Sequence, residues 1–162
     1  MDAHDTPIAG RMRAFEELCR RQGMPVTVQR RVILEAVLAS HDHPTADEIY
    51  DRICGRIPEI SRTTVYRVLD TLVGLGMIGR AHHPGSAARF DAKTHRHHHL
   101  VCTSCRKMID YETPELNDLP LPEPPFGFQV TDYSIQFMGL CPDCRAAAHG
   151  RGDEPSAQRL RT

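Results

Sequence analysis

Two pairs of cysteines constrain this chain more than any other feature. Cys102 and Cys105 form one C-x-x-C pair, and Cys141 and Cys144 form the second. Each pair can present two sulfurs from a tight turn, and four thiolates complete the tetrahedral shell that structural Zn²⁺ prefers. The spacing therefore predicts one zinc site that joins two distant segments. A redox C-x-x-C is the alternative, and a second pair in the same small region makes zinc the better interpretation.

Histidines gather beside the first cysteine pair. The stretch RFDAKTHRHHHLVCTSC contains Asp91 and four histidines. On a strand, His97 and His99 would share one face, and His98 would point the other way. Two imidazoles with carboxylates suit Fe²⁺, Mn²⁺ or Zn²⁺. If zinc takes the cysteines, the segment serves a second metal site; a solvated histidine run is the alternative.

Composition limits the possible partners and the location. The 162 residues carry a formal charge of −1, and residues 1–88 hold eleven basic and eleven acidic side chains. DNA binding would therefore need a local patch rather than a polybasic surface. The segment MDAHDTPIAGRMR lacks the apolar core of a signal peptide, and no apolar run could span a bilayer. We expect a cytoplasmic protein without a membrane partner, in which thiols stay reduced.

The first half of the chain predicts four helices. Arg11–Arg21 reads as the first, and Thr27 can cap a second that extends to about Ala39. Thr45 and Glu48 form a capping-box pattern for a third helix that ends near Gly55. Ser61 can cap a fourth, which ends near Gly74 or Gly76.

The fourth helix has two contrasting faces. Its core face carries Val65, Val68, Leu69 and Leu72 at helical spacing. Arginine, tyrosine and threonine suit phosphates, base edges and thymine methyl groups. A solvated face is the alternative. The candidate DNA-binding residues on the opposite side are Arg62, Thr63, Tyr66 and Arg67.

The order of elements indicates the fold class. MIGRAH and ARFD flank the turn-rich HPGSA, which predicts a β-hairpin after the helices. This is the order of a winged helix-turn-helix domain, although an unrelated helical domain stays open. Beyond it, HHHLV, KMIDYE and FQVTDYSIQFMGL read as strands, and PELNDL reads as a short helix that prolines stop by Leu119.

We therefore predict an α+β protein. A winged helix-turn-helix domain covers residues 1–88, and a small α/β domain with the four-cysteine zinc site covers residues 89–149. Residues 150–162, rich in charge and poor in large apolar side chains, are expected to form a disordered tail.

Seven motifs in this order resemble the ferric uptake regulator family, from about Arg11 to Arg145. They are Thr27-Val28-Gln29-Arg30, HPTADEIY from His43, Thr64-Val65-Tyr66-Arg67, Arg89-Phe90-Asp91, His97-x-His99 and the two cysteine pairs. Any one of these motifs is weak, but the combination is highly specific.

The resemblance implies a homodimeric, metal-activated transcriptional repressor that binds double-stranded operator DNA and is not an enzyme. Its second domain would be a dimerisation domain. By position, structural Zn²⁺ falls on the four paired cysteines. The regulatory ion, Fe²⁺ or Mn²⁺ with Zn²⁺ as a further option, falls on His43, Asp91, His97, His99 and Asp110.

Within the family, the chain most resembles the peroxide-responsive repressors. They carry aspartate at the positions of Asp91 and Asp110, where iron sensors usually carry glutamate. In those proteins, bound Fe²⁺ reacts with hydrogen peroxide and the resulting radical oxidises a histidine ligand. The corresponding oxidation-sensitive residues here are His43 and His97.

Some positions depart from the family pattern. Arg67 is typical of iron sensors, and Pro25 replaces a basic residue that usually reaches the minor groove. The proline-rich LPLPEPP replaces part of a usual helix. The ligand positions of a third metal site seen in some members fall on Arg96, His98, Asn117 and Leu140, so we predict two metals per subunit.

Two other functional readings remain. An iron- or zinc-uptake regulator is the nearer alternative, although the cysteine that zinc sensors commonly place near the wing is absent here. A zinc enzyme using the histidine cluster is a distant alternative. The chain contains no H-E-x-x-H, no G-x-S-x-G and no phosphate-binding glycine loop.

Overall fold

The computed structural model describes residues 8–81 and 86–149, and it divides into two compact units. The first unit ends at His95, and the second begins at Arg96. The strand Arg89–Asp91 pairs with an earlier strand and so belongs to the first unit. A boundary after Ala88 would separate these two paired strands. The predicted disordered tail, residues 150–162, lies outside the described residues.

Four helices form most of the first unit: α1 (Ile8–Arg21), α2 (Val28–Leu38), α3 (Ala46–Ile53) and α4 (Arg62–Gly74). All three predicted N-caps are confirmed. The Thr27 and Ser61 side chains accept hydrogen bonds from backbone N–H groups of the first turns. Thr45 and Glu48 form a complete capping box. These caps satisfy backbone donors that the helix itself leaves unpaired.

The core of the first unit lies among these helices. Buried side chains of all four helices pack together, with Phe15 and Ile33 fully inaccessible. The predicted core face of α4 is confirmed, because Val65, Leu69 and Leu72 are fully buried and Val68 is nearly so. The opposite face of α4 is thereby left toward solvent.

A short hairpin follows the helices. β1 (Gly79–Ala81) pairs antiparallel with β2 (Arg89–Asp91), and Gly79 lies opposite Asp91. Part of the connecting turn, residues 82–85, is outside the described chain. Helices followed by this hairpin confirm the predicted winged helix-turn-helix order.

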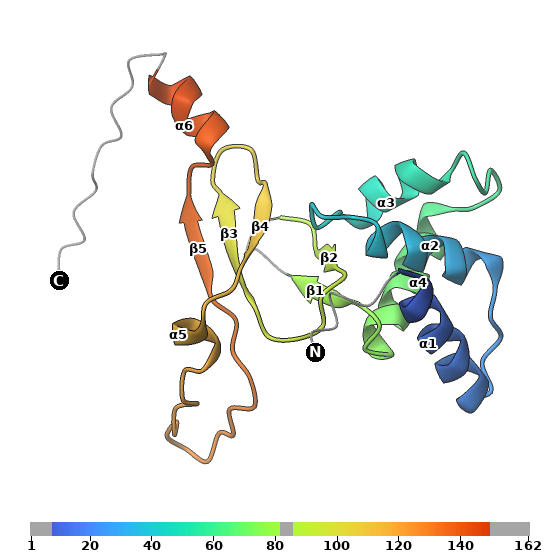
Figure 1. Cartoon of the computed structure of the whole chain (residues 1–162), viewed down its shortest axis with the longest axis horizontal. Helices are drawn as coiled ribbons and strands as arrows, with labels where there is room; N and C mark the ends of the chain where they lie inside the picture. The colour runs from blue at the N-terminus through green and yellow to red at the C-terminus, as the bar shows by residue number, and fades with distance from the viewer. Residues whose placement is uncertain (1–7, 82–85, 150–162) are drawn as a thin grey trace. The chain divides into compact units, whose positions relative to one another are not determined.

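The second unit is built on a three-stranded sheet of β3 (His98–Cys102), β4 (Met108–Tyr111) and β5 (Gln136–Gly139). Figure 1 shows β3 between its two neighbours. β3 pairs antiparallel with β4 and parallel with β5. Two short helices, α5 (Pro114–Asn117) and α6 (Pro142–His149), complete the unit. The mixture of helices and small sheets confirms the α+β class.

Two predictions for the second unit need correction. The strand expected over FQVTDYSIQFMGL is only β5, because β3 begins at His98 and offers no strand edge opposite residues 128–134. Helix α6 was not predicted, although Pro142 and the alanines of PDCRAAAH are compatible with a helix start. The short helix α5 ends before Leu119 as predicted, and LPLPEPP forms neither helix nor strand. None of the described helices is long and apolar enough to cross a membrane.

Candidate metal centres and DNA-binding face

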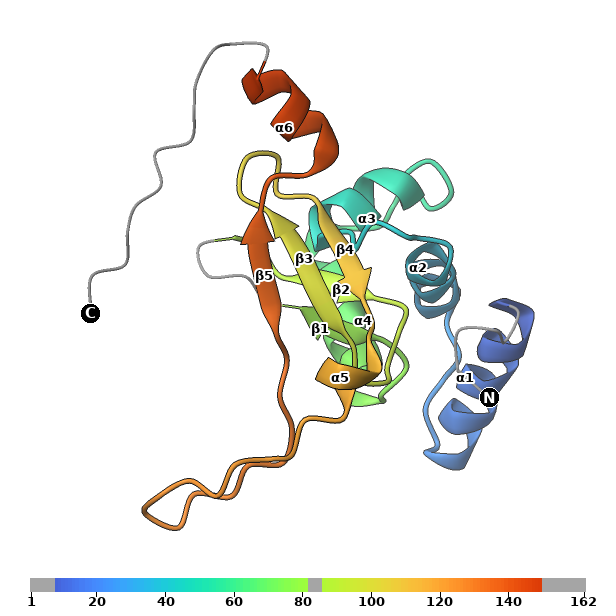
Figure 2. The same ribbon diagram turned by 60° about the vertical axis from the view of Figure 1, so that its left-hand side comes forward.

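The four paired cysteines converge at one end of the second unit's sheet. Cys102 ends β3, and Cys105 follows in the β3–β4 turn. Cys141 and Cys144 lie at the start of α6, and in both ribbon views this start and the β3–β4 turn share one end of the sheet (Figures 1 and 2). Their sulfurs lie within 4.8 Å of one another. The parallel pairing of β3 with β5 is what joins the two pairs.

The sulfur geometry fits a tetrahedral zinc ion. The sulfurs of Cys105 and Cys141 are 3.7 Å apart. Two sulfurs bound at about 2.3 Å to one tetrahedral ion lie about 3.8 Å apart. The backbone N–H groups of Cys141 and Cys105 lower the pKa of Cys102 to about 6, which favours the thiolate that zinc binds. Ser104 acts to lower the pKa of Cys144, but the thiols of Cys141 and Cys105 outweigh it and raise that pKa to about 11.

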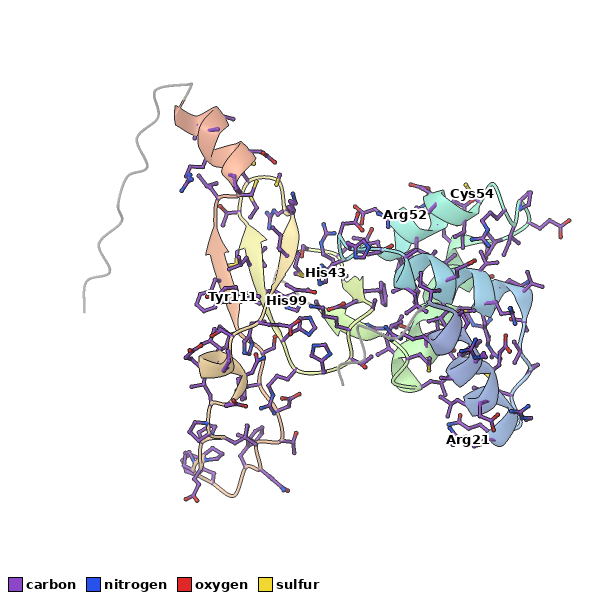
Figure 3. The ribbon with its side chains drawn as sticks, in the orientation of Figure 1. Arg21, His43, Arg52, Cys54, His99 and Tyr111 are labelled. Carbon is purple, nitrogen blue, oxygen red and sulfur yellow. The ribbon has the colours of Figure 1, made fainter. Side chains whose placement is uncertain are left out.

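Three of the predicted regulatory ligands meet on one face of the same sheet. His99 on β3 lies directly opposite Asp110 on β4 (Figure 3 labels His99). Side chains at directly opposite positions share a face, and His97 shares it because it lies two residues before His99. The Nε2 atoms of His97 and His99 are 3.1 Å apart. The Asp110 carboxylate is 3.6 Å from the first and 3.8 Å from the second.

The other two predicted ligands are paired within the first unit. His43 lies in the loop between α2 and α3 (Figure 3), and Asp91 ends β2. The Nε2 atom of His43 is 3.3 Å from Oδ2 of Asp91. The second carboxylate oxygen of Asp91 accepts a hydrogen bond from the Lys93 N–H at 2.8 Å, which orients the carboxylate.

Both groups of side chains have the spacing of metal ligands. Two ligand atoms bound at about 2.1 Å to one ion lie about 3.0–3.4 Å apart. The pair His43 and Asp91 falls in this range, and the group of His97, His99 and Asp110 departs from it by a few tenths of an ångström. A pair or a trio alone leaves the coordination shell of a first-row metal incomplete, which is the chemical reason to consider the five residues together.

Two of the residues at the positions of the family's third metal site, Arg96 and His98, pack on the same aromatic ring. The Arg96 guanidinium is 2.9 Å from the Asp132 carboxylate and stacks 4.4 Å above the Tyr133 ring. His98 is fully buried and points away from His97 and His99. Its ring stacks on the same Tyr133 ring, with the two ring centres 5.7 Å apart. The prediction of two metals per subunit stays a prediction.

The predicted DNA-binding residues lie on α4, but their surroundings differ. Arg62 forms ion pairs with Asp47 at 2.6 Å and Asp51 at 3.1 Å, and it stacks on Tyr50 at 4.3 Å. Hydrogen bonding to Asp47 raises the pKa of Arg62, although burial opposes this. Tyr66 is 45% exposed.

Arg67 borders a cavity, lined mostly by polar residue types, that was not predicted from the sequence. The cavity has a volume of about 260 Å³ and is also lined by Arg30. Its other lining residues come from the start of α2 and from α4: Thr27, Gln29, Thr64, Val68 and Thr71. Among the described residues, neither Arg30 nor Arg67 has a carboxylate partner. Two guanidiniums without acidic partners suit a phosphate or a base edge.

Comparison with known proteins decides the family. The sequence profile of the ferric uptake regulator family matches residues 21–138. The chain belongs to the ferric uptake regulator family. Within this family of transcriptional regulators it is similar to peroxide-responsive repressors. The one from Staphylococcus saprophyticus is 38% identical over 127 residues, which cover 78% of this chain and 86% of that protein.

Solved structures of this family share the fold. The ferric uptake regulator of Helicobacter pylori superimposes with a TM-score of 0.72 over 86% of this chain and 95% of that one; at 19% identity this likeness shows the fold alone. The regulator of Vibrio cholerae is 30% identical, with a TM-score of 0.59 over 78% of this chain and 99% of that one.

Proposed function

We propose that this protein is a metal-dependent, DNA-binding transcriptional repressor with Zn²⁺ on the four paired cysteines. Its regulatory ion, Fe²⁺ or Mn²⁺ with Zn²⁺ as a further option, is held by His43, Asp91, His97, His99 and Asp110. One observation carries this proposal: two imidazoles and a carboxylate share a sheet face at ligand spacing. The second unit supplies these three ligands, and the His43–Asp91 pair of the first unit can complete the shell.

Such a shared ion explains how a metal controls DNA binding. With ligands from both units, it restrains one unit against the other and selects the arrangement in which both recognition helices of a dimer fit the operator. Because the coupling is reciprocal, operator DNA must tighten metal binding by the same factor. The four-sulfur zinc site has no open position, so it supports the fold of the second unit and is not the regulated site.

We infer that the regulatory site senses peroxide. Both of its carboxylates are aspartates, and the Staphylococcus saprophyticus relative is a peroxide-responsive repressor. Fe²⁺ held by these residues would supply one-electron chemistry toward hydrogen peroxide beside the imidazole ligands. His43 and His97 are the residues that we expect to be oxidised. Loss of either ligand would release one unit from the other and lower operator affinity.

The DNA partner is proposed to be double-stranded operator DNA held by α4. Its candidates are Arg62, Thr63, Tyr66 and Arg67, of which Arg67 has no acidic partner among the described residues. Arg62 can reach DNA only by leaving Asp47 and Asp51. We therefore assign base recognition chiefly to Arg67 and Tyr66.

A homodimer is supported by an apolar face of the second unit's sheet. Leu100 lies opposite Ile109 on β4 and Phe137 on β5, and all three are about two-fifths exposed. Tyr111 extends this face by an edge-to-face contact with Phe137 at 5.9 Å. A contiguous apolar face spread over three strands is typical of a protein interface. We propose that a second copy of the chain covers it, and that this dimer acts in the cytoplasm.

Intact mass after peroxide treatment tests the sensing step. Zinc-containing protein is loaded with one equivalent of Fe²⁺ without oxygen, treated with peroxide, and mapped by peptide mass. We expect one added oxygen atom on the peptide that holds His43 or His97. His98 serves as the internal control, because it is buried between two ligands but points away from them. Mn²⁺-loaded protein should stay unmodified.

A metal-uptake regulator is the second candidate, and Arg67 after Tyr66 favours it. Fe²⁺-loaded protein that remains unmodified by peroxide would support this candidate instead. Operator titrations with Fe²⁺, Mn²⁺ and Zn²⁺, each with and without peroxide, separate the two functions. A peroxide sensor binds the operator with each activating metal and loses that binding only in the Fe²⁺ plus peroxide arm, whereas an uptake regulator keeps its metal-dependent binding when peroxide is added. A zinc enzyme has no support from the family, whose members are regulators.

A further inference from the structure

The backbone of His43 has an uncommon conformation. Its φ is +49°, in the left-handed region that residues other than glycine rarely occupy. Such a conformation persists only where surrounding contacts hold it, and it often marks a functional position. The contacts around His43 therefore bear directly on the metal site.

Arg89 on β2 supplies one of these contacts. Its Nη1 atom donates a hydrogen bond to the His43 carbonyl at 2.8 Å and lies 3.5 Å from Oε2 of Glu48. The same Glu48 oxygen accepts a hydrogen bond from the Thr45 N–H at 2.7 Å. One guanidinium thus connects the carbonyl of a proposed ligand to the capping box of α3.

The loop that carries His43 is also bonded to β2 through the backbone. The Phe90 N–H donates a hydrogen bond to the Pro44 carbonyl at 2.9 Å. A bridge of the antiparallel type pairs Thr45 with Arg89. The loop is therefore attached to the strand at three successive residues, and the strand ends at the second ligand of the pair, Asp91.

We propose that Arg89 is a positioning residue for the regulatory metal, holding His43 against Asp91 before the ion binds. This inference rests on the proposed function, because it takes both residues as ligands. A pre-organised pair offers two ligand atoms without the entropy cost of ordering the loop at the moment of binding. Arg89 thus sets metal affinity without touching the ion.

The placement of Arg89 also distinguishes it from a DNA contact. Its side chain is 17% exposed, and Glu48 offsets its charge. A guanidinium that recognised a phosphate would need to be more accessible. Loss of Arg89 should therefore weaken metal binding, while operator affinity at saturating metal stays close to the wild-type value.

The test compares Arg89→Met with Arg80→Met in the full-length, zinc-containing protein. Arg80 lies on the other strand of the hairpin, pairs with Asp70 and lies over the Phe90 ring. Within the described part of the chain it makes no hydrogen bond to the His43 loop. Mn²⁺ affinity is measured by electron paramagnetic resonance, and Co²⁺ absorption spectra report the ligands directly. Arg89→Met should raise the Mn²⁺ Kd about ten-fold, the lower end of the range for residues that orient ligands. The Mn²⁺ Kd of Arg89→Lys should lie between those of the wild type and Arg89→Met.

The Co²⁺ spectrum separates positioning from simple stabilisation. In Arg89→Met it should move toward the spectrum of His43→Ala, while melting of the metal-free protein should match Arg80→Met. A Kd change no larger than that of Arg80→Met, or an altered melting temperature with an unaltered Co²⁺ spectrum, would overturn the inference.

The variant His43→Ala distinguishes a failure of the positioning role of Arg89 from a failure of the proposed five-ligand site. If this variant changes the Co²⁺ spectrum and Arg89→Met does not, only the positioning role of Arg89 is wrong. If His43→Ala itself leaves Mn²⁺ affinity and the Co²⁺ spectrum unchanged, the five-ligand site of the proposed function is wrong, and the role of Arg89 with it.

Discussion

Arg62 and Arg67 lie on the same exposed side of α4, yet their neighbours give them different roles. At 3.6 residues per turn they lie about 140° apart around the helix axis, at the two edges of that side. Helical spacing cannot predict that Asp47 and Asp51 of α3 pair with Arg62, or that no acidic side chain in the described part of the chain pairs with Arg67. The exposure of these side chains was thus predictable, whereas their ion pairing depends on packing between α3 and α4. Their contact with DNA stays a prediction.

Arg67→Ala should weaken binding to a specific operator by about 1–3 kcal/mol, the usual worth of a good base contact. Binding to a random duplex should fall much less, because the non-specific part of affinity comes from phosphates. Fluorescence anisotropy at fixed salt measures both. Arg62→Ala is the control and should affect operator binding less. An equal loss on the two duplexes would make Arg67 a phosphate contact.

Gly79 is a second residue whose surroundings decide its role. A Cβ atom there would lie 2.9 Å from the Lys93 carbonyl oxygen and 3.6 Å from Cβ of Asp91. Gly79→Ala should therefore cost about 1–3 kcal/mol, the usual range for overpacking. Urea unfolding measures this cost in the free energy of unfolding. Metal affinity should fall with it, because the displaced Lys93 backbone holds the Asp91 carboxylate through its N–H. Gly74→Ala has open space around it and should be neutral or stabilising; a similar loss in both variants would contradict this account.

At the scale of elements, local signals predicted more than long-range ones. The caps of α2, α3 and α4 depend on residues three positions apart, so sequence spacing suffices to find them. The length of β5 depends instead on where β3 begins, and the pairing of His99 with Asp110 depends on strand register. Asp110 could therefore be proposed as a ligand only by resemblance to the family.

The sheet of the second unit also carries the proposed dimer face. Phe137→Glu places a charge on this face, opposite Leu100 of the central strand. We expect this variant to be monomeric at concentrations where the wild type is dimeric, because burying an unpaired carboxylate is costly. Analytical ultracentrifugation measures the masses. Val28→Glu, at another exposed apolar position, is the control. A Phe137→Glu dimer of unchanged stability would place the interface elsewhere.

At the scale of the whole molecule, charge balance limits non-specific DNA binding. The formal net charge is −1. Several arginines of the first unit form ion pairs with Asp or Glu side chains, which weakens their electrostatic attraction to DNA phosphates. Metal-controlled geometry can therefore set operator occupancy without strong competition from non-specific attraction. The paired arginines include Arg20, Arg31, Arg52, Arg56, Arg62 and Arg80.

A reversibly bound ion is proposed to convert the protein into its operator-binding form. The most direct test uses an operator selected from random duplexes with Mn²⁺-loaded protein. Its affinity is then compared for loaded protein and for protein stripped by a chelator that leaves the cysteine-bound zinc in place. We predict that the loaded form binds about 5- to 150-fold more tightly, the usual range of coupling between two sites. Equal affinity of the two forms, with zinc content verified, would contradict the account.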